Sequence, residues 1–589
     1  MSPAPDTKRG RVRHRVAGSV QSCATSLELL VPLVYIVVLS FSFSDRLFPL
    51  DDAQELSFVR NLESVSSLFR SDVFGLFRPL KNILFLAFDH MLPVVGVRGC
   101  RSIGIAIGVL SFFPVLALCR RVLGNEAKAL AAASIWLLSP TLVSSAAWLS
   151  CANVQMMVSL SALSVVFHDA TWNDGRCRPS RVLLAGALLF LSLVSYECAI
   201  ATLPILLLFD FLLRPGRTGN REAWWAYAFY AAIVVAYLTI RHSFNASTKV
   251  NGSFANVERW QIVVSSPFFT GEHFLSWFWP FGRFTVLGSY RWGDAPWIVL
   301  VLCTAVFVSA LAFAIAKRKQ FPVLSFCILH SIFAFAPVSN CLGLRNGPYG
   351  DYYLSLASVG LAVGCAELCS IFLRAKGSSR LFAFAAVALF ASIRLFAIPE
   401  AARWASMWSQ GILAFEQSVR NYPRYFSNKQ MLATLLFDAG RFEESLDFAR
   451  QVEEDVGSDS YQMENVYIVR LLYALRVERN ADAAFREIEN CRRASMGGKR
   501  IALLRFYRGC VFDDLKGDEE TAEKEYELAL SGRWDVDSVP CADRLARLKA
   551  IHGERDEAIA LWEKALKLDP DNAAVRWNLS VARRQKQDK

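Results

Sequence analysis

Paired cysteines are missing from this sequence. Its 14 cysteines are scattered, without a CxxC pair or histidines at metal-ligand spacing. The sequence therefore predicts neither a metal cluster nor a disulfide framework, and most of the cysteines are expected to be small buried helix residues. His90 and His273 have no ligand-like spacing. We therefore assign no metal.

Charged residues are scarce in one part of the chain only. The 589 residues include 64 basic and 53 acidic ones. Residues 401–589 hold 30 basic and 32 acidic side chains, which leaves 34 and 21 in the first 400. The positive excess thus lies in the apolar part, where it indicates membrane topology rather than a nucleic-acid surface. No nucleic-acid partner is predicted.

A signal-peptide cleavage site is also missing. The basic N-terminus, residues 1–25, precedes an apolar run, but no A-x-A-like sequence follows that run. We therefore predict a retained first span with a cytoplasmic N-terminus, with a cleaved signal peptide as the alternative.

Long apolar runs are present up to about residue 398. They predict an all-α, polytopic transmembrane domain over residues 26–398, with about eleven spans. The expected spans are 26–44, 101–119, 127–147, 153–168, 182–197, 199–213, 222–241, 297–315, 321–337, 353–372 and 381–398.

Basic clusters fall between alternate spans and are predicted to be cytoplasmic. They lie at residues 13–15, 119–121, 175–181, 214–217, 316–319 and 373–380. Because basic residues flank both ends of 182–213, this run should be a hairpin with Tyr196 and Glu197 at its outer tip. The loops that then face the outside are 45–98, 242–296 and 338–352, together with residues 399–589.

The segment 399–589 contains charged amphipathic helices with a repeated pattern. A glycine is followed five residues later by a small residue, in the pairs Gly440/Ser445, Gly517/Ala522 and Gly553/Ala558. This pattern resembles the tetratricopeptide (TPR) repeat, with a degenerate copy at residues 479–489. The resemblance implies a soluble α-solenoid that binds a protein or peptide. A structural cap on the membrane domain is the alternative.

The expected span interiors are nearly free of charge, whereas acidic and polar residues gather at outer helix ends. A proton-coupled transporter would carry ionisable residues in mid-span, so this distribution argues against a transporter. It favours a site at the outer face, where a lipid-borne headgroup meets a water-soluble acceptor.

Two motifs in the first outer loop carry a family resemblance. "LDDAQ" supplies Asp51 and Asp52, and "LFRPLKN" supplies Arg78. This arrangement resembles GT-C-type membrane glycosyltransferases, especially the transmembrane and TPR-repeat-containing O-mannosyltransferases and their bacterial relatives. "SYECAIATLPILLLFD" with Glu197, "YYLSLASVG" (352–360) and the entry into the repeats follow in the same order as in that family.

The sequence departs from the family pattern at two places. In "SPTLVSSAAWLSCAN" the family's glutamate position is Ser144 and no arginine follows, and the lysine expected before Glu197 is Tyr196. These departures leave open a catalytically silent membrane anchor that displays a TPR scaffold.

The resemblance implies transfer of a sugar from a polyprenyl-phosphate carrier to a hydroxyl of a protein or cell-envelope acceptor. Such transfer needs a base and donors for the leaving phosphate. Asp51 is the expected base, and Asp52 would position acceptor or donor. Two adjacent carboxylates raise each other's pKa, which suits a base near neutral pH. A solvated loop or a helix N-cap is the alternative for this pair.

The remaining candidates bind the donor. Arg78 would bind phosphate, or anchor the chain at the interface. Glu197 would bind sugar hydroxyls or hold a basic partner such as Arg78. Lesser phosphate candidates are Arg241 and Arg345, and Tyr352 and Tyr353 would line the donor pocket or belong to an aromatic belt. We expect a multi-pass protein of a bacterial inner membrane, with site and repeats on the periplasmic side.

Overall fold

The architecture is that of a computed structural model. It describes residues 26, 28–41, 51–60, 62, 64–69, 72, 76–173, 176–244, 254–255, 257–339, 350–374, 376, 379–457, 461–494, 500–532, 534, 536–570 and 572–587. Arg345 lies outside these residues. Within the described parts nearly all regular structure is helical, which confirms the predicted all-α class. The exceptions are an antiparallel pair, β1 with β2, and a parallel pair, β3 with β4.

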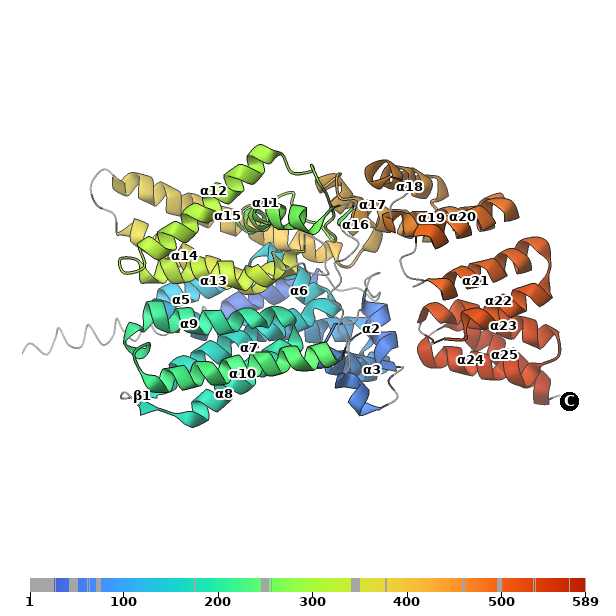
Figure 1. The fold of residues 1–589 in the computed structure, drawn as a ribbon, viewed down its shortest axis with the longest axis horizontal. Helices are drawn as coiled ribbons and strands as arrows, with labels where there is room; N and C mark the ends of the chain where they lie inside the picture. Colours follow the sequence, from blue (N-terminus) through green and yellow to red (C-terminus); the bar gives the residue numbers. More distant parts are fainter. Residues whose placement is uncertain are drawn as a thin grey trace, which may run out of the picture.

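The membrane part contains the helices that run lengthwise in Figure 1. After a helix Glu28–Ser40, its elements are α2 (Asp51–Arg60), η1 (Val65–Phe69), α3 (Pro79–Leu110), α4 (Phe112–Leu123), α5 (Glu126–Leu137), η2 (Pro140–Leu142), α6 (Val143–Ala147), η3 (Leu149–Cys151), α7 (Ala152–Asp169), β1 (Trp172–Asn173), β2 (Arg176–Cys177), α8 (Pro179–Ser195), η4 (Glu197–Ala201), α9 (Thr202–Leu213), η5 (Pro215–Arg217), α10 (Arg221–Ser243), β3 (Phe254–Ala255), α11 (Arg259–Phe278), β4 (Tyr290–Arg291), α12 (Trp297–Ala316), α13 (Pro322–Phe335), η6 (Ala336–Val338), η7 (Asp351–Tyr353), α14 (Leu354–Leu373) and α15 (Ser379–Met407).

Six helical stretches of the described chain are long and apolar enough to cross a membrane. They are Pro79–Leu123, Leu149–Asp169, Arg221–Ser243, Trp297–Ala316, Asp351–Leu373 and Arg380–Met407. A seventh is counted if the pair Glu126–Leu137 and Pro140–Ala147, bent by 59°, forms one span. The count is lower than the predicted eleven because the 3₁₀ turn Pro140–Leu142 interrupts one apolar run and other runs form helices shorter than 18 residues. Three shorter apolar helices, Glu28–Ser40, Pro179–Ser195 and Pro322–Val338, account for further predicted spans.

The run 182–213 is a hairpin, as predicted. Arg181, in the first turn of α8, donates to the carbonyl of Ala170, and Arg217, after α9, donates to the carbonyl of Asp169. Both ends of the run therefore lie together. The Asp169 carboxylate also pairs with Arg121 at 3.3 Å, so three of the predicted cytoplasmic clusters share one end of the helices. We call this the basic end, and the end that carries α2 the TPR end.

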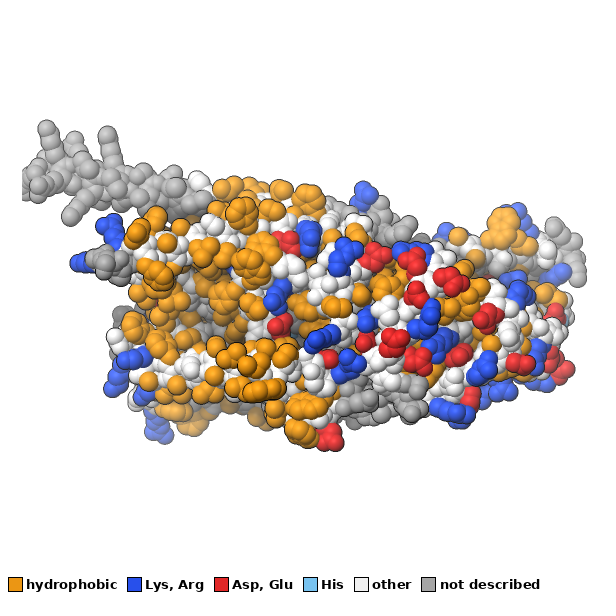
Figure 2. All heavy atoms as spheres, turned by 90° about the horizontal axis from the view of Figure 1, so that it is seen from above, with side chains coloured by type: hydrophobic (Ala, Val, Ile, Leu, Met, Phe, Trp, Pro, Cys, Tyr) orange, Lys and Arg blue, Asp and Glu red, His pale blue; other side chains and the backbone are white. Residues whose placement is uncertain are grey.

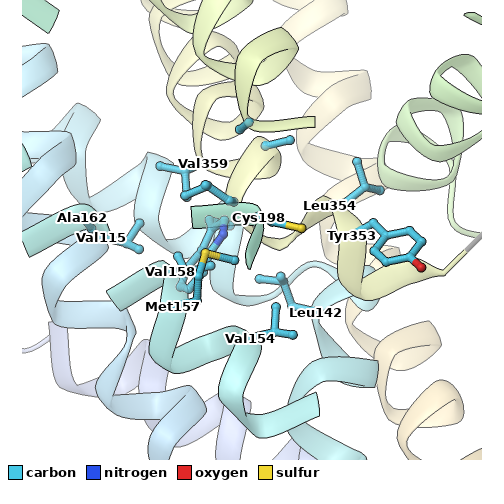
Figure 3. Packing of buried hydrophobic residues seen from close by; sticks show 14 of the residues in the cluster. Val115, Leu142, Val154, Met157, Val158, Ala162, Cys198, Tyr353, Leu354 and Val359 are labelled. Carbon is cyan, nitrogen blue, oxygen red and sulfur yellow. The ribbon is translucent and has the colours of Figure 1, made fainter. Parts of the chain in front are cut away.

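The interior between these spans is closely packed. Figure 3 shows Val115 of α4, Met157 of α7, Cys198 of η4 and Leu354 of α14 converging on one core. All four side chains are at most 5% exposed. The outside of the helices is apolar as well, as the orange surface in Figure 2 shows. A protein with an apolar core and an apolar outer surface suits a lipid environment.

The repeat part is an array of paired helices whose surface mixes acidic and basic side chains (Figure 2). Its elements are α16 (Gly411–Asn421), α17 (Phe426–Asp438), α18 (Phe442–Val456), η8 (Tyr461–Met463), α19 (Glu464–Tyr473), η9 (Ala474–Glu478), α20 (Ala481–Ala494), α21 (Ile501–Val511), η11 (Phe512–Lys516), α22 (Glu519–Ala529), η12 (Val536–Ser538), α23 (Val539–Ile551), α24 (Arg555–Leu568) and α25 (Ala573–Gln587).

The repeat glycines lie in the predicted turns. Gly440, Gly517 and Gly553 have φ of 78°, 65° and 90°, in the left-handed region where a side chain is disfavoured. In the degenerate copy the corresponding left-handed residue is Arg479, with φ of 49°. The small residue five positions after each glycine is fully buried between paired helices. The prediction of helical repeats in this segment is therefore confirmed.

The array contacts the membrane part near its start and near its end. At its start, the Asn428 side chain bonds the backbone of Leu287, in the segment after α11. At its end, the Leu568 carbonyl accepts a hydrogen bond from Arg60 of α2 at 3.1 Å. The array is thus held at both ends across the TPR end of the membrane helices.

Candidate active site

The acidic pair begins helix α2. Asp51 and Asp52 occupy its first turn, where the positive end of the helix dipole favours negative charge. The structural alternative for this pair was a solvated loop or a helix N-cap, whereas both residues lie inside the first turn of α2. Their carboxyl groups differ in their surroundings. Asp52 is fully buried, and its Oδ1 accepts hydrogen bonds from the Ser150 backbone N–H at 3.0 Å and the Ser150 hydroxyl at 2.6 Å. Asp52 thereby fixes α2 to η3.

Asp51 remains available for chemistry. Its side chain is half-buried, and its carboxylate receives no hydrogen bond from the described part of the chain. Burial raises the pKa of Asp51 to about 7; the nearby Lys81 ammonium opposes this rise, and Glu55, Asp52 and Asp72 add to it. Repulsion within the acidic pair, the reason given from sequence, is therefore a smaller cause than burial. The outcome is a carboxyl group that exchanges a proton near neutral pH.

A buried charge cluster lies beside Asp51. Lys81, in the first turn of α3, binds Glu55 at 2.5 Å and lies 4.0 Å from Asp72. Asp72 also accepts a hydrogen bond from the Leu76 backbone N–H at 2.7 Å, which shapes the approach to α3. One ammonium group is thus shared among several carboxylates. Lys81 also provides a positive charge near the candidate base.

Arg78 and Glu197 form a two-point ion pair. The Arg78 Nε and Nη2 atoms each donate to one Glu197 oxygen at 2.7 Å. The guanidinium also lies 4.2 Å from the centre of the Tyr196 ring. Burial would raise the pKa of Glu197, but attraction to Arg78 and the two hydrogen bonds outweigh it and hold that pKa at about 2. Glu197 is therefore a permanent carboxylate that orients Arg78.

The other donor-binding candidates lie around this pair. Arg241, in the last turn of α10, adds to the lowering of the Glu197 pKa. The ring centroids of Tyr352 and Tyr353 in η7 are 4.5 Å apart. The Tyr352 ring also packs edge-on against Trp148, with 6.1 Å between the ring centroids. Arg345 falls outside the described residues and is not placed.

The first turn of α3 joins the two halves of the site. Arg78 directly precedes this helix, and Lys81 follows three residues later. Lys81 in turn is the cation that acts on the Asp51 carboxyl group. The candidate base, the buried lysine and the arginine–glutamate pair are therefore neighbours at the TPR end. No group of three His, Cys, Asp or Glu side chains suited to a metal ion occurs in the described ranges.

Sequence reasoning missed three members of this cluster. Two of them could have been predicted from the sequence. Lys81 lies inside the motif "LFRPLKN", and Glu55 follows Asp51 by four residues, which places both on the same face of a helix. Asp72 could not have been predicted, because it lies in the loop before α3, where no local pattern links it to Lys81.

Comparisons with known proteins gave one family match and several similar solved structures. A family model described as "TPR repeat" matches residues 550–586, and no curated protein matches the sequence. Among solved structures, a thermophilic TPR protein from Thermus thermophilus is 22% identical, covers 33% of this chain and 94% of its own, and has a TM-score of 0.24.

Two further solved structures match over more of the chain. The archaeal oligosaccharyltransferase from Archaeoglobus fulgidus, in complex with an inhibitory peptide and a dolichol-phosphate, is 12% identical, with a TM-score of 0.41. The match covers 86% of this chain and 72% of that one. ArnT from Cupriavidus metallidurans, bound to undecaprenyl phosphate, is 15% identical over 78% of this chain and 80% of its own, with a TM-score of 0.35.

Proposed function

We propose that this chain is a membrane glycosyltransferase that moves a sugar from a polyprenyl-phosphate carrier to a hydroxyl of a protein or cell-envelope acceptor. The observation that carries the proposal is Asp51, a half-buried carboxyl group whose pKa is raised to about 7. Its oxygens accept no hydrogen bond within the described chain, the buried Lys81 ammonium lies near it, and the buried Arg78 lies three residues before Lys81. A base and cations for a leaving phosphate are what this reaction requires.

Asp51 would take the proton of the acceptor hydroxyl while the acceptor oxygen attacks the anomeric carbon of the sugar. The bond from that carbon to the carrier phosphate breaks, and its electron pair leaves with the phosphate. The products are the glycosylated acceptor and the polyprenyl phosphate, with the proton on Asp51. Asp52, which is bonded to Ser150, would hold the start of α2 in place rather than react.

The leaving phosphate would be stabilised by Arg78. Glu197 occupies its Nε and Nη2, whereas Nη1 has no partner among the described residues and is free to donate. Glu197 would thus orient the guanidinium rather than bind sugar. Arg241 is a second donor on the same side, and Tyr352 and Tyr353 would line the donor pocket.

The TPR array would supply the acceptor. Its last repeat touches α2 through Arg60 and Leu568, so an acceptor bound along the array would lie near Asp51. We place the protein in a bacterial inner membrane as a multi-pass protein, with site and array on the periplasmic side. Positively charged loops at the basic end would then be cytoplasmic.

A catalytically silent membrane anchor for the TPR array is the second candidate. The closed Arg78–Glu197 pair, with Tyr196 stacked where the resembled family has lysine, favours it. In that case the same residues would serve only to hold η4 against the start of α3.

An assay of sugar transfer from defined donors distinguishes the glycosyltransferase from the silent anchor. Purified full-length protein is incubated with synthetic polyprenyl-phosphate sugars and acceptor peptides, and glycosylated product is measured by mass spectrometry. Wild-type protein should form product, and Asp51→Asn should reduce the rate by at least about a hundredfold. Asp447→Asn, an exposed carboxylate of the array, is the matched control and should behave as wild type. No product from any donor would favour the silent anchor.

A further inference from the structure

A cavity of about 600 Å³ lies between α5, α14 and α15, away from the candidate active site. Its wall is formed mostly by small and aliphatic side chains, among them Ala131 and Ile135 of α5 and Val387 of α15. Helix α15 is largely exposed, since only 11% of its apolar 18-residue stretch is buried inside the protein. A membrane lipid can therefore reach this cavity from the side.

The charged side chains that line the cavity are all basic. They are Lys128, Arg374 and Arg394. Lys128 is paired with Glu367 at 2.7 Å. Arg394 donates to the carbonyls of Trp277 and Phe278, and it lies against the Trp277 ring.

Arg394 leaves its Nε and Nη1 without a hydrogen-bond partner in the described chain, but Arg374 lacks any side-chain hydrogen bond or ion pair there. Arg374 follows the last residue of α14 and is exposed. Lys128 lies near it in the first turn of α5, so both mark the basic end of the cavity. A cationic rim with an apolar interior fits an anionic amphiphile.

The length of the cavity matches one acyl chain. Along α5 it extends from Ala127 to Leu138. Eleven steps of ~1.5 Å give roughly 16 Å. The hydrocarbon core of a bilayer is ~30 Å thick, so this is about the depth of one leaflet.

We propose that this cavity binds an anionic phospholipid of the leaflet at the basic end. Its phosphate is held by Arg374, with Lys128 beside it, and one acyl chain fills the apolar interior. Basic pockets between transmembrane helices are known to select anionic headgroups. The proposal goes beyond sugar transfer, because a sugar carrier would place its phosphate near Arg78 at the opposite end.

Binding is tested on purified full-length protein in detergent, without any activity assay. Native mass spectrometry counts bound lipid during titration with phosphatidylglycerol or with phosphatidylcholine of the same chains. Phosphatidylglycerol should bind saturably and more tightly. Arg374→Gln should weaken this binding about tenfold, the effect of losing one charge-assisted hydrogen bond.

The matched control is Lys319→Gln. It removes one exposed positive charge from the turn between α12 and α13, which does not line the cavity. This variant should bind phosphatidylglycerol like the wild type. Lysophosphatidylglycerol, with a single chain, should bind comparably, whereas glycerol 3-phosphate should not bind. Equal binding by the two variants, or no preference over phosphatidylcholine, would overturn the proposal.

Discussion

At the scale of single residues, Asp51 gives the reaction a predictable pH dependence. Its pKa, raised to about 7 by burial, means that the carboxylate form dominates only above that pH. A base works as the carboxylate, so kcat/KM should rise about tenfold per pH unit below the midpoint and level off above it. Initial rates measured across the neutral range check this. A profile without a transition near pH 7 would remove Asp51 from the mechanism.

The same raised pKa affects folding stability. An unfolded aspartate has a pKa of about 3.9. Between that value and about 7, the folded protein holds a proton on Asp51 that the unfolded chain has released. The stability due to this proton is present at low pH and is lost as pH rises through the folded pKa. Asp51→Asn should therefore melt no lower than wild type at alkaline pH, which separates a catalytic defect from a folding defect.

Arg78→Lys tests the two-point pair with Glu197. A lysine keeps the charge but cannot supply the planar fork that now makes two 2.7 Å hydrogen bonds. We expect lower transfer at limiting carrier concentration and a lower melting temperature. Combined with Glu197→Gln, the double variant should show a coupling of about 1–3 kcal/mol, measured by denaturation. Strictly additive effects would mean that the pair is not coupled.

How far the site could be predicted depends on the kind of signal. Asp51, Asp52 and Arg78 lie in short motifs, so sequence alone pointed to them. The sequence allowed two interpretations of Glu197, as a ligand of sugar hydroxyls or as an ion-pair partner of Arg78, because 119 residues separate Arg78 from Glu197. The buried state of Asp52 and the approach of Asp72 depend on how the loop packs, which no local pattern encodes. The pKa of Asp51 was expected to rise, although burial rather than its neighbour is the main cause.

At the scale of helices, the repeat turns were predictable because glycine is the residue that tolerates a positive φ. Gly553→Ala should destabilise the last repeat by about 1 kcal/mol, since its φ of 90° is strained for any side chain. Gly532→Ala is the matched control, because that glycine has open space around it and no positive φ. Thermal unfolding followed by circular dichroism should show a lower melting temperature for Gly553→Ala only. Equal effects would mean that the turn is not the constraint.

Arg60 connects two elements that belong to different halves of the chain. Its Nε binds Asp89 of α3 at 2.6 Å, and its Nη1 reaches the Leu568 carbonyl at the end of α24. Arg60→Gln should loosen α2 from the last repeat and speed amide hydrogen exchange in both. Since α2 begins with Asp51, kcat should fall while the pH midpoint stays unchanged.

The control for this contact lies in the same repeat. Arg583 pairs with Glu563 on the exposed surface and does not touch α2. Arg583→Gln should leave both exchange and turnover at wild-type levels. If Arg60→Gln behaves in the same way, the contact does not position the helix.

At the scale of the whole molecule, the basic clusters predicted the arrangement better than the apolar runs did. Charges at both ends of residues 182–213 predicted the hairpin, and Asp169 gathers basic residues from separate loops at one end. The span count was less predictable, because 3₁₀ turns such as Pro140–Leu142 break apolar runs without changing their composition. Local hydropathy cannot register a break that depends on tertiary packing.

The arrangement leads to a topology prediction for the entire chain. If the basic end is cytoplasmic, α2 and the array lie together on the other side of the membrane. Single cysteines at Ala53 and Ser531, both exposed positions, should then react with an impermeant thiol reagent added to intact cells. A cysteine at Lys319, near the basic end, should react only after lysis. The background keeps the buried cysteines and replaces the others by serine.

The outcome of this labelling bears directly on the proposed reaction. The contact between Arg60 and Leu568 requires α2 and the last repeat to be on the same side of the membrane. Labelling at residue 53 with protection at residue 531 would therefore contradict the structure itself. Protection at both, with labelling at residue 319, would invert the whole protein and place the site in the cytoplasm. Labelling at both, with residue 319 protected, would bring an acceptor on the array to Asp51 without crossing the bilayer.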